Sequence, residues 1–191
     1  MLVKFFLFFM LLLNIVHASS LKIGFIDELF LKDGKTPSWG MKSLKGFKLE
    51  LPREFNVIEK DVGFSSIKAS NTAKALILDD DVDVIVGLRM GGQAMLVKRH
   101  ADEYKVPYIS VMATPDEMFS KDGYVFSMAI RNSYQIESVL AEYIEEPEHK
   151  KTIYTFVTQD CFYCVSMAKL LKEHAKSMGI TVKEGGVLLH N

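Results

Sequence analysis

The chain has 191 residues, of which 49% are hydrophobic, with 23 lysines and arginines against 24 aspartates and glutamates. This composition excludes collagen-like, low-complexity and disordered classes, because the chain is long enough to bury a substantial hydrophobic core. A formal net charge of -1, without a long run of one sign, indicates neither nucleic-acid binding nor a polybasic membrane patch.

The first 20 residues have the features of a secretory signal peptide. A single cation, Lys4, precedes an apolar run at residues 5–16, and Ala18 supplies a small residue after it. That run is shorter than the roughly 20 residues that a membrane-spanning helix needs. We therefore expect residues 1–18 to be removed as a signal peptide and the mature protein to be periplasmic; an uncleaved amino-terminal anchor is the alternative.

The rest of the chain alternates between short apolar runs, typical of buried strands, and stretches with the apolar spacing of helices. The expected elements, in chain order, are a strand at 21–26, a helix at 39–51, a strand at 55–62, a helix at 67–78, a strand at 82–88, a helix ending at Tyr104, a strand at 108–112, a hairpin-like stretch at 123–129, a helix at 133–144, a strand at 152–157, a helix at 164–178 and a strand beginning at 180–183.

Strands separated by helices of this length imply right-handed crossovers and a parallel sheet that helices cover on both faces. We therefore predict an α/β fold with an open parallel sheet, whose ligands would bind beyond the carboxyl ends of the strands. The charged stretch at residues 145–151 marks the expected domain boundary. It would separate a first lobe at residues 19–146 from the start of a second, incomplete lobe at residues 147–191.

Five segments carry a likeness to a known family: LKIGFI, DVGFSSIKASNTAKALILDDDVDVIVG, VPYISVMATPDEM, YVFSMAIRNSYQIESVLAEYI and KKTIYTFVTQDCFYC. In order and spacing they resemble the type I periplasmic binding proteins, specifically the branched-chain amino acid receptor family of ABC transporters. The resemblance implies two α/β lobes, joined by a hinge, that close over a small solute. The closed form is then handed to an ABC permease in the membrane.

The resemblance also implies ligand contacts on both lobes. Thr114, with the main chain at Met112 and Ala113, matches the residues that hold the ligand's charged end in the first lobe. Tyr163 matches the aromatic residue that closes over the ligand from the second lobe. A hydroxyl and main-chain groups at a strand's end can bind a zwitterion, and a tyrosine ring excludes water. The alternatives are a helix cap before Pro115 for Thr114 and simple packing for Tyr163.

The segment after the strand at 82–88 departs from the family pattern. Where relatives carry a ligand-binding serine or threonine, this chain has Gly91, so the side-chain hydroxyl is missing there. Arg89 is then a candidate for pairing with an anionic group of the solute, because a guanidinium offers a planar fork of donors suited to a carboxylate. Its alternative is an exposed surface charge. The implied solute is a small polar compound, such as an amino acid or a related molecule.

The resemblance implies a binding protein rather than an enzyme, with no cofactor. Relatives continue for a comparable stretch beyond Asn191, so we expect the second half of the binding fold to be absent from this chain. The five histidines are dispersed and show no zinc-binding spacing, so no metal site is expected either.

The pair Cys161 and Cys164 supports a rival interpretation. It lies between an expected strand and an expected helix, which is also the local layout of thioredoxin-like redox sites. A thiol at a helix amino terminus has a lowered pKa, so Cys161 could attack a substrate disulfide and Cys164 resolve it. The alternatives are therefore a thiol-disulfide oxidoreductase and, within the binding protein, a structural disulfide formed in an oxidising compartment.

Overall fold

The computed structural model describes residues 20–146, 151–158 and 161–188. The expected signal peptide lies outside these residues. Among the residues described, no helix is long and apolar enough to cross a membrane.

The first lobe is built on a five-stranded sheet in the order β2-β1-β3-β4-β5, and every neighbouring pair is parallel. The strands are β1 (Lys22–Asp27), β2 (Asn56–Asp61), β3 (Val84–Gly87), β4 (Tyr108–Ser110) and β5 (Val125–Ser127). From Ile23 onward every residue of β1 is buried, as expected for a parallel strand covered on both faces. The predicted α/β class with an open parallel sheet is confirmed.

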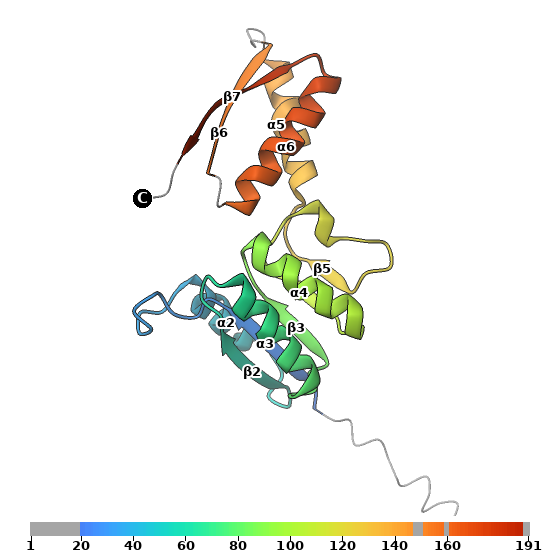
Figure 1. The fold of residues 1–191 in the computed structure, drawn as a ribbon. Helices are drawn as coiled ribbons and strands as arrows, with labels where there is room; N and C mark the ends of the chain where they lie inside the picture. Colours follow the sequence, from blue (N-terminus) through green and yellow to red (C-terminus); the bar gives the residue numbers. More distant parts are fainter. Residues whose placement is uncertain (1–19, 147–150, 159–160, 189–191) are drawn as a thin grey trace, which may run out of the picture.

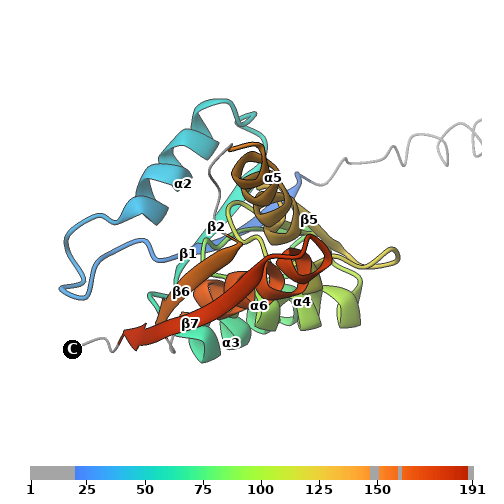
Figure 2. The same ribbon diagram turned by 90° about the horizontal axis from the view of Figure 1, so that it is seen from above.

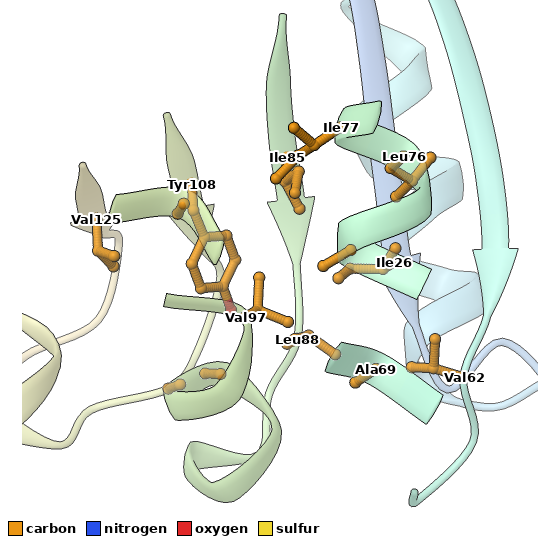
Figure 3. Close-up of a cluster of buried hydrophobic side chains, with 14 of the residues drawn as sticks. Ile26, Val62, Ala69, Leu76, Ile77, Ile85, Leu88, Val97, Tyr108 and Val125 are labelled. Atoms are coloured by element: carbon orange, nitrogen blue, oxygen red, sulfur yellow. The ribbon is translucent and has the colours of Figure 1, made fainter. Parts of the chain in front are cut away.

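Helices cover both faces of this sheet (Figures 1 and 2). On one face lie α3 (Ser66–Leu78) and α4 (Gly91–Tyr104), and on the other lies α2 (Trp39–Leu49). The buried residues of α3 recur at helical spacing, which turns one side of the helix toward the sheet. Figure 3 shows Leu76 and Ile77 of this helix beside Ile26 and Ile85 of the sheet.

The second lobe is smaller and consists of a two-stranded parallel sheet with two helices on one face (Figure 1). Its strands are β6 (Thr152–Thr158) and β7 (Thr181–Leu188), and its helices are α5 (Asn132–Glu145) and α6 (Phe162–Ser177). The core that joins them contains Ile136, Leu140, Ala175 and Ile180. Helix α5 therefore packs with α6, β6 and β7, and the expected boundary after residue 146 lies between α5 and β6.

One element differs from its expectation. Residues 123–129 do not form a hairpin; instead β5 pairs in parallel with β4 as the edge strand of the first sheet. A short 3-10 helix, η1 (Asp116–Met118), fills part of the connection between these two strands. The hairpin prediction was wrong because β5 has only three residues, and a strand this short leaves almost no periodic signal in the sequence.

Candidate functional site

The candidate site lies at the carboxyl edge of the first sheet, where the loops after β1, β3 and β4 meet. Since the three strands are parallel neighbours, their last residues emerge at the same edge. Backbone hydrogen bonds join the loops: the Leu88 amide donates to the Ile26 carbonyl at 3.0 Å, and the Met112 amide to the Leu88 carbonyl at 3.4 Å. The first-lobe residues expected to bind solute, Arg89, Gly91, Met112, Ala113 and Thr114, all follow β3 or β4.

The chain leaves β3 through a sharp turn. Gly87 has a φ of 131°, and a Cβ atom there would lie 2.0 Å from the Ile26 carbonyl oxygen, so only glycine fits. Leu88 follows with a φ of 62°, a left-handed conformation that is uncommon for a residue with a branched side chain. Its side chain is fully buried in the core, which holds the turn in place and delivers Arg89 to the end of β1.

Arg89 is engaged with two carboxylates of the neighbouring loop. Its Nη2 lies 2.7 Å from Glu28 Oε2, and its Nε lies 3.5 Å from Asp27 Oδ1. The guanidinium side chain is 21% exposed, whereas those of Asp27 and Glu28 are 2% and 5% exposed. Arg89 is thus neither a free surface charge nor an unpaired cation. No pattern in the sequence had indicated that Asp27 and Glu28 would form part of the same cluster.

The cluster leaves two buried oxygens without a hydrogen-bond partner in the described structure, Asp27 Oδ2 and Glu28 Oε1. Burial raises the pKa of Asp27 above its ordinary value of 3.8, and this outweighs the lowering by the Glu28 amide and by Arg89. One cation therefore faces two carboxylates in a largely buried environment. The cost of removing these charges from water makes the arrangement unfavourable for the stability of the fold.

The loop after β4 is held by internal hydrogen bonds. The Ala113 amide donates to Ser110 Oγ at 3.1 Å, and the Thr114 carbonyl accepts from the Asn132 amide at 3.0 Å. The N-cap residue of η1 is Pro115, and no side chain there accepts a hydrogen bond from the first turn. Thr114 is therefore not the cap of this helix. Met112 is exposed and Ala113 is buried. Among the described interactions, none engages the Thr114 hydroxyl, which leaves it available to a ligand.

The second lobe meets this edge through Phe162, the first residue of α6. A Cβ atom on Gly91 would lie 2.8 Å from Pro115 Cγ and 3.2 Å from Phe162 Cδ1, so the ring is packed directly against this glycine. Tyr163, the expected closing residue, instead donates its hydroxyl to Gln135 Oε1 of α5 at 3.1 Å. The sequence predicted a role for Tyr163 and none for Phe162. The only sequence feature that pointed to Phe162 was its place beside Tyr163 in CFYC, which does not tell which of the two rings lies against the first lobe.

The two cysteines form a disulfide at the amino-terminal end of α6. Cys161 is the cap residue of the helix, and its Sγ accepts a hydrogen bond from the Cys164 amide at 3.2 Å. The bond therefore closes the first turn of the helix that carries Phe162 and Tyr163.

Two grooves lie on the second lobe. The larger, of about 570 Å³, runs between the β6–β7 sheet and α6 and is lined by Val157, Val165, Lys169 and Gly186 among others. The smaller shares Thr155, Val157 and Ala168 with the larger and also reaches Ile136 and Cys164. None of the expected first-lobe ligand residues lines either groove. No cluster of metal-binding side chains is found within the ranges that the structure describes.

Comparison with known proteins agrees with the architecture. A model of the periplasmic binding protein family matches residues 20–187. A leucine-binding protein, LivK, from Thermotoga maritima has a TM-score of 0.74 at 18% identity, over 90% of this chain and 49% of its own. The isoleucine complex of LivJ from Streptococcus pneumoniae gives 0.69 at 20% identity, over 90% and 49%.

A solute-binding protein from Rhodopseudomonas palustris, in complex with 4-hydroxybenzoate, gives a TM-score of 0.67 at 16% identity, over 90% of this chain and 47% of its own. At these identities the likeness shows the fold. The chain spans about half the length of these solved structures. No curated protein matches it.

The contact between Gly91 and Phe162 predicts different outcomes for two adjacent glycines. Gly91→Ala should lower the free energy of unfolding by roughly 1–3 kcal/mol, because its methyl group overlaps Pro115 and Phe162. Gly92→Ala is the matched control, since its nearest neighbours lie 3.7 and 3.8 Å away. It should leave stability unchanged or raise it by about 0.5–1 kcal/mol. Denaturant unfolding measures both, and equal effects would contradict this packing.

The buried carboxylate predicts a pH-dependent gain for Asp27→Asn. Because burial raises the pKa of Asp27, its contribution to stability is fully present below pH 3.8 and is lost as the pH rises through the raised value. The variant should therefore unfold at higher denaturant concentration than the unmodified protein at pH 7, with the gain shrinking as the pH falls toward 3.8. Asp122→Asn, in an exposed loop, is the control. A variant that is less stable at pH 7 would contradict this account.

Proposed function

Because the chain belongs to the periplasmic binding protein family, we propose that it takes part in binding a small polar solute, such as an amino acid or a related compound. The solute would contact the carboxyl edge of the first lobe and leave chemically unchanged, so the protein would act as a receptor and not as an enzyme. The observation that carries this proposal is the meeting of the loops after β3 and β4 at one edge, with α6 of the second lobe packed against it.

In this proposal Thr114 and the main chain of Met112 and Ala113 hold one end of the solute. Two points support the assignment: the Thr114 hydroxyl has no partner among the described interactions, and Met112 is 56% exposed. Arg89 and Gly91 would complete the first-lobe contact. A hydroxyl and a guanidinium on loops at the same edge of the sheet suit a solute that carries both a charged end and polar substituents.

Closure would involve the amino-terminal end of α6. Tyr163 would have to exchange its hydrogen bond to Gln135 for one to the solute, whereas Phe162 already lies against Gly91. A solute can shift the balance between open and closed forms only by binding one of them more tightly. The first turn of α6 carries both aromatic rings, so its contacts with the solute would make the solute bind the closed form more tightly than the open form.

The proposed partner is an ABC permease, and the proposed location is the periplasm after removal of residues 1–18. The named ligands of two solved relatives, isoleucine and 4-hydroxybenzoate, both carry a carboxylate, which makes small carboxylic acids the first solutes to test. Import by a transporter would distinguish this role from a sensory one, because both begin with the same binding step.

Binding predicts thermal stabilisation by solute. Isoleucine or 4-hydroxybenzoate should raise the unfolding temperature of the purified protein in proportion to the logarithm of its concentration, since about 2.7 kcal/mol is gained at a hundredfold excess over the dissociation constant. Thr114→Ala should reduce this shift, whereas Thr181→Ala, an exposed position at the start of β7, should not. A flat response to a panel of amino acids, amides and carboxylic acids would argue against the proposal.

A second candidate function is thiol-disulfide exchange, favoured by the disulfide at the amino-terminal end of α6. Oxidoreductase activity would require a dithiol reductant to open the Cys161–Cys164 disulfide. The Cys161 thiolate would then attack the substrate disulfide and release one substrate thiol, and Cys164 would release the second thiol as the Cys161–Cys164 disulfide forms again. We expect instead that the protein does not catalyse insulin reduction by dithiothreitol above the rate of its Cys161→Ser variant. A rapid turnover that is lost in this variant would reverse the ranking of the two functions.

A further inference from the structure

The disulfide between Cys161 and Cys164 is a feature of α6 that solute binding leaves unexplained. The bond joins residues three positions apart, at the start of a single helix. A disulfide constrains the unfolded chain more strongly the longer the loop that it closes, so this short ring adds little stability by that route. It also does not tie two elements of the fold together. Its effect is therefore on the local shape of the turn that it closes.

The two residues inside this ring are the ones through which the start of α6 meets other elements. Phe162 packs against the first lobe, and a Cβ atom on Gly91 would lie 3.2 Å from its Cδ1. Tyr163 donates its hydroxyl to Gln135 Oε1 of α5 at 3.1 Å. Figure 1 shows this end of α6 beside the first lobe. A change in the backbone of the turn would therefore displace both rings.

The rest of α6 is anchored independently of the disulfide. Its later turns pack in the core of the second lobe through Met167, Leu170, Leu171 and Ala175. The first turn has weaker anchors, because Phe162 is 44% and Tyr163 is 42% exposed. The first amides of a helix also have no carbonyl partner within the helix. Opening the bond would therefore loosen the first turn and leave the remainder of the helix in place.

The position of the bond favours its reduction. Cys161 is the cap residue of α6, and its Sγ accepts a hydrogen bond from the Cys164 amide at 3.2 Å. The same amide and the positive end of the helix would stabilise a thiolate at Cys161, which makes this sulfur a good leaving group. The first turn carries no acidic residue to oppose that charge. Both cysteines are partly exposed, so a small dithiol can reach the bond.

We infer that Cys161 and Cys164 form a reversible redox site that controls the contact between the lobes. The intact disulfide holds Phe162 against the first lobe, and a dithiol reductant that opens the bond releases it. This role goes beyond solute binding, and only its consequence for solute affinity rests on the proposed function. The change occurs once per chain, so it requires no catalytic turnover.

The reduction proceeds by thiol-disulfide exchange with the dithiol. A thiolate of the reductant attacks Cys164 Sγ, the bond between the two sulfurs breaks, and Cys161 leaves as a thiolate. The second thiol of the reductant then displaces Cys164 from the mixed disulfide, and its proton passes to the Cys164 sulfur. The reductant becomes a disulfide, and the two electrons that it loses reduce the protein's disulfide.

Thiol labelling of the folded protein tests whether the bond is a redox site. The protein is treated with dithiothreitol without denaturant, then with a maleimide, and its mass is measured. Both cysteines should be labelled after reduction, and neither should be labelled before it. Treatment with oxidised glutathione between the two steps should restore the unlabelled form. Cysteines that react only after denaturation would show a buried structural bond and overturn the inference.

The effect of Phe162→Ala in the two redox states tests whether the bond holds the ring. In the oxidised protein this variant should lower the denaturant midpoint, because the packing against Gly91 is lost. In the reduced protein the shift should fall to about half or less, since the contact is already loosened. Phe156→Ala, in β6 of the same lobe, is the matched control and should shift the midpoint equally in both states. Equal shifts for Phe162→Ala, or unfolding on reduction alone, would overturn the inference.

The double variant Cys161→Ser with Cys164→Ser separates the bond from the reductant. A serine at position 161 can still cap the helix, so this protein should remain folded and behave as the reduced form with or without dithiothreitol. A response of this variant to dithiothreitol would contradict the assignment of the effect to the disulfide.

Calorimetric titration tests the consequence for solute binding. Isoleucine or 4-hydroxybenzoate should bind the oxidised protein about threefold or more tightly than the reduced one, because the turn is already ordered before binding. Equal affinity in the two states would contradict control of the solute site by the bond. Failure of both compounds to bind either state would count against the proposed function, whereas the labelling and the Phe162→Ala comparison would still decide the redox site.

Discussion

The parallel pairing of β1 with β3 is the constraint on which the site depends. It brings the carboxyl ends of two strands to the same edge, in a register that pairs residues 61 positions apart and sets Ile26 opposite Gly87. Only this register places Asp27 and Glu28 within reach of Arg89. A slip by one residue would exchange the β1 side chains that face α2 with those that face α3, and would move Asp27 and Glu28 relative to Arg89. Hydrophobic burial and the site's geometry therefore depend on the same register.

The second lobe is coupled to that edge by close packing rather than by charge. Gly91 and Pro115 pack against Phe162, and the Asn132 amide at the start of α5 donates a hydrogen bond to the Thr114 carbonyl at 3.0 Å. The disulfide constrains the turn from which Phe162 projects. Figure 1 shows α5 and α6 on one face of the β6–β7 sheet. Tyr154 and Phe156 of β6 are exposed in the described structure.

Sequence reasoning succeeded where local signals were strong. The apolar runs of β1 and β3 and the helical spacing in α3 gave the correct elements, and the order of segments gave the correct family. It failed at β5, where three residues carry no usable period. It gave the helix α5 correctly but not its packing against α6. It named Arg89 and Gly91 as candidate site residues. It could not show that two carboxylates bind Arg89 or that the ring of Phe162 packs against Gly91.

The sequence by itself therefore determined the class of fold, the family and the loops in which the candidate site lies, because periodicity and motif order are properties of neighbouring residues. Tertiary structure decided which side chains meet. The pairing of Arg89 with Glu28, the contact of Phe162 with Gly91 and the bond of Tyr163 to Gln135 join residues 28 or more positions apart. Such contacts depend on strand register and helix packing, which exist only once the chain has folded.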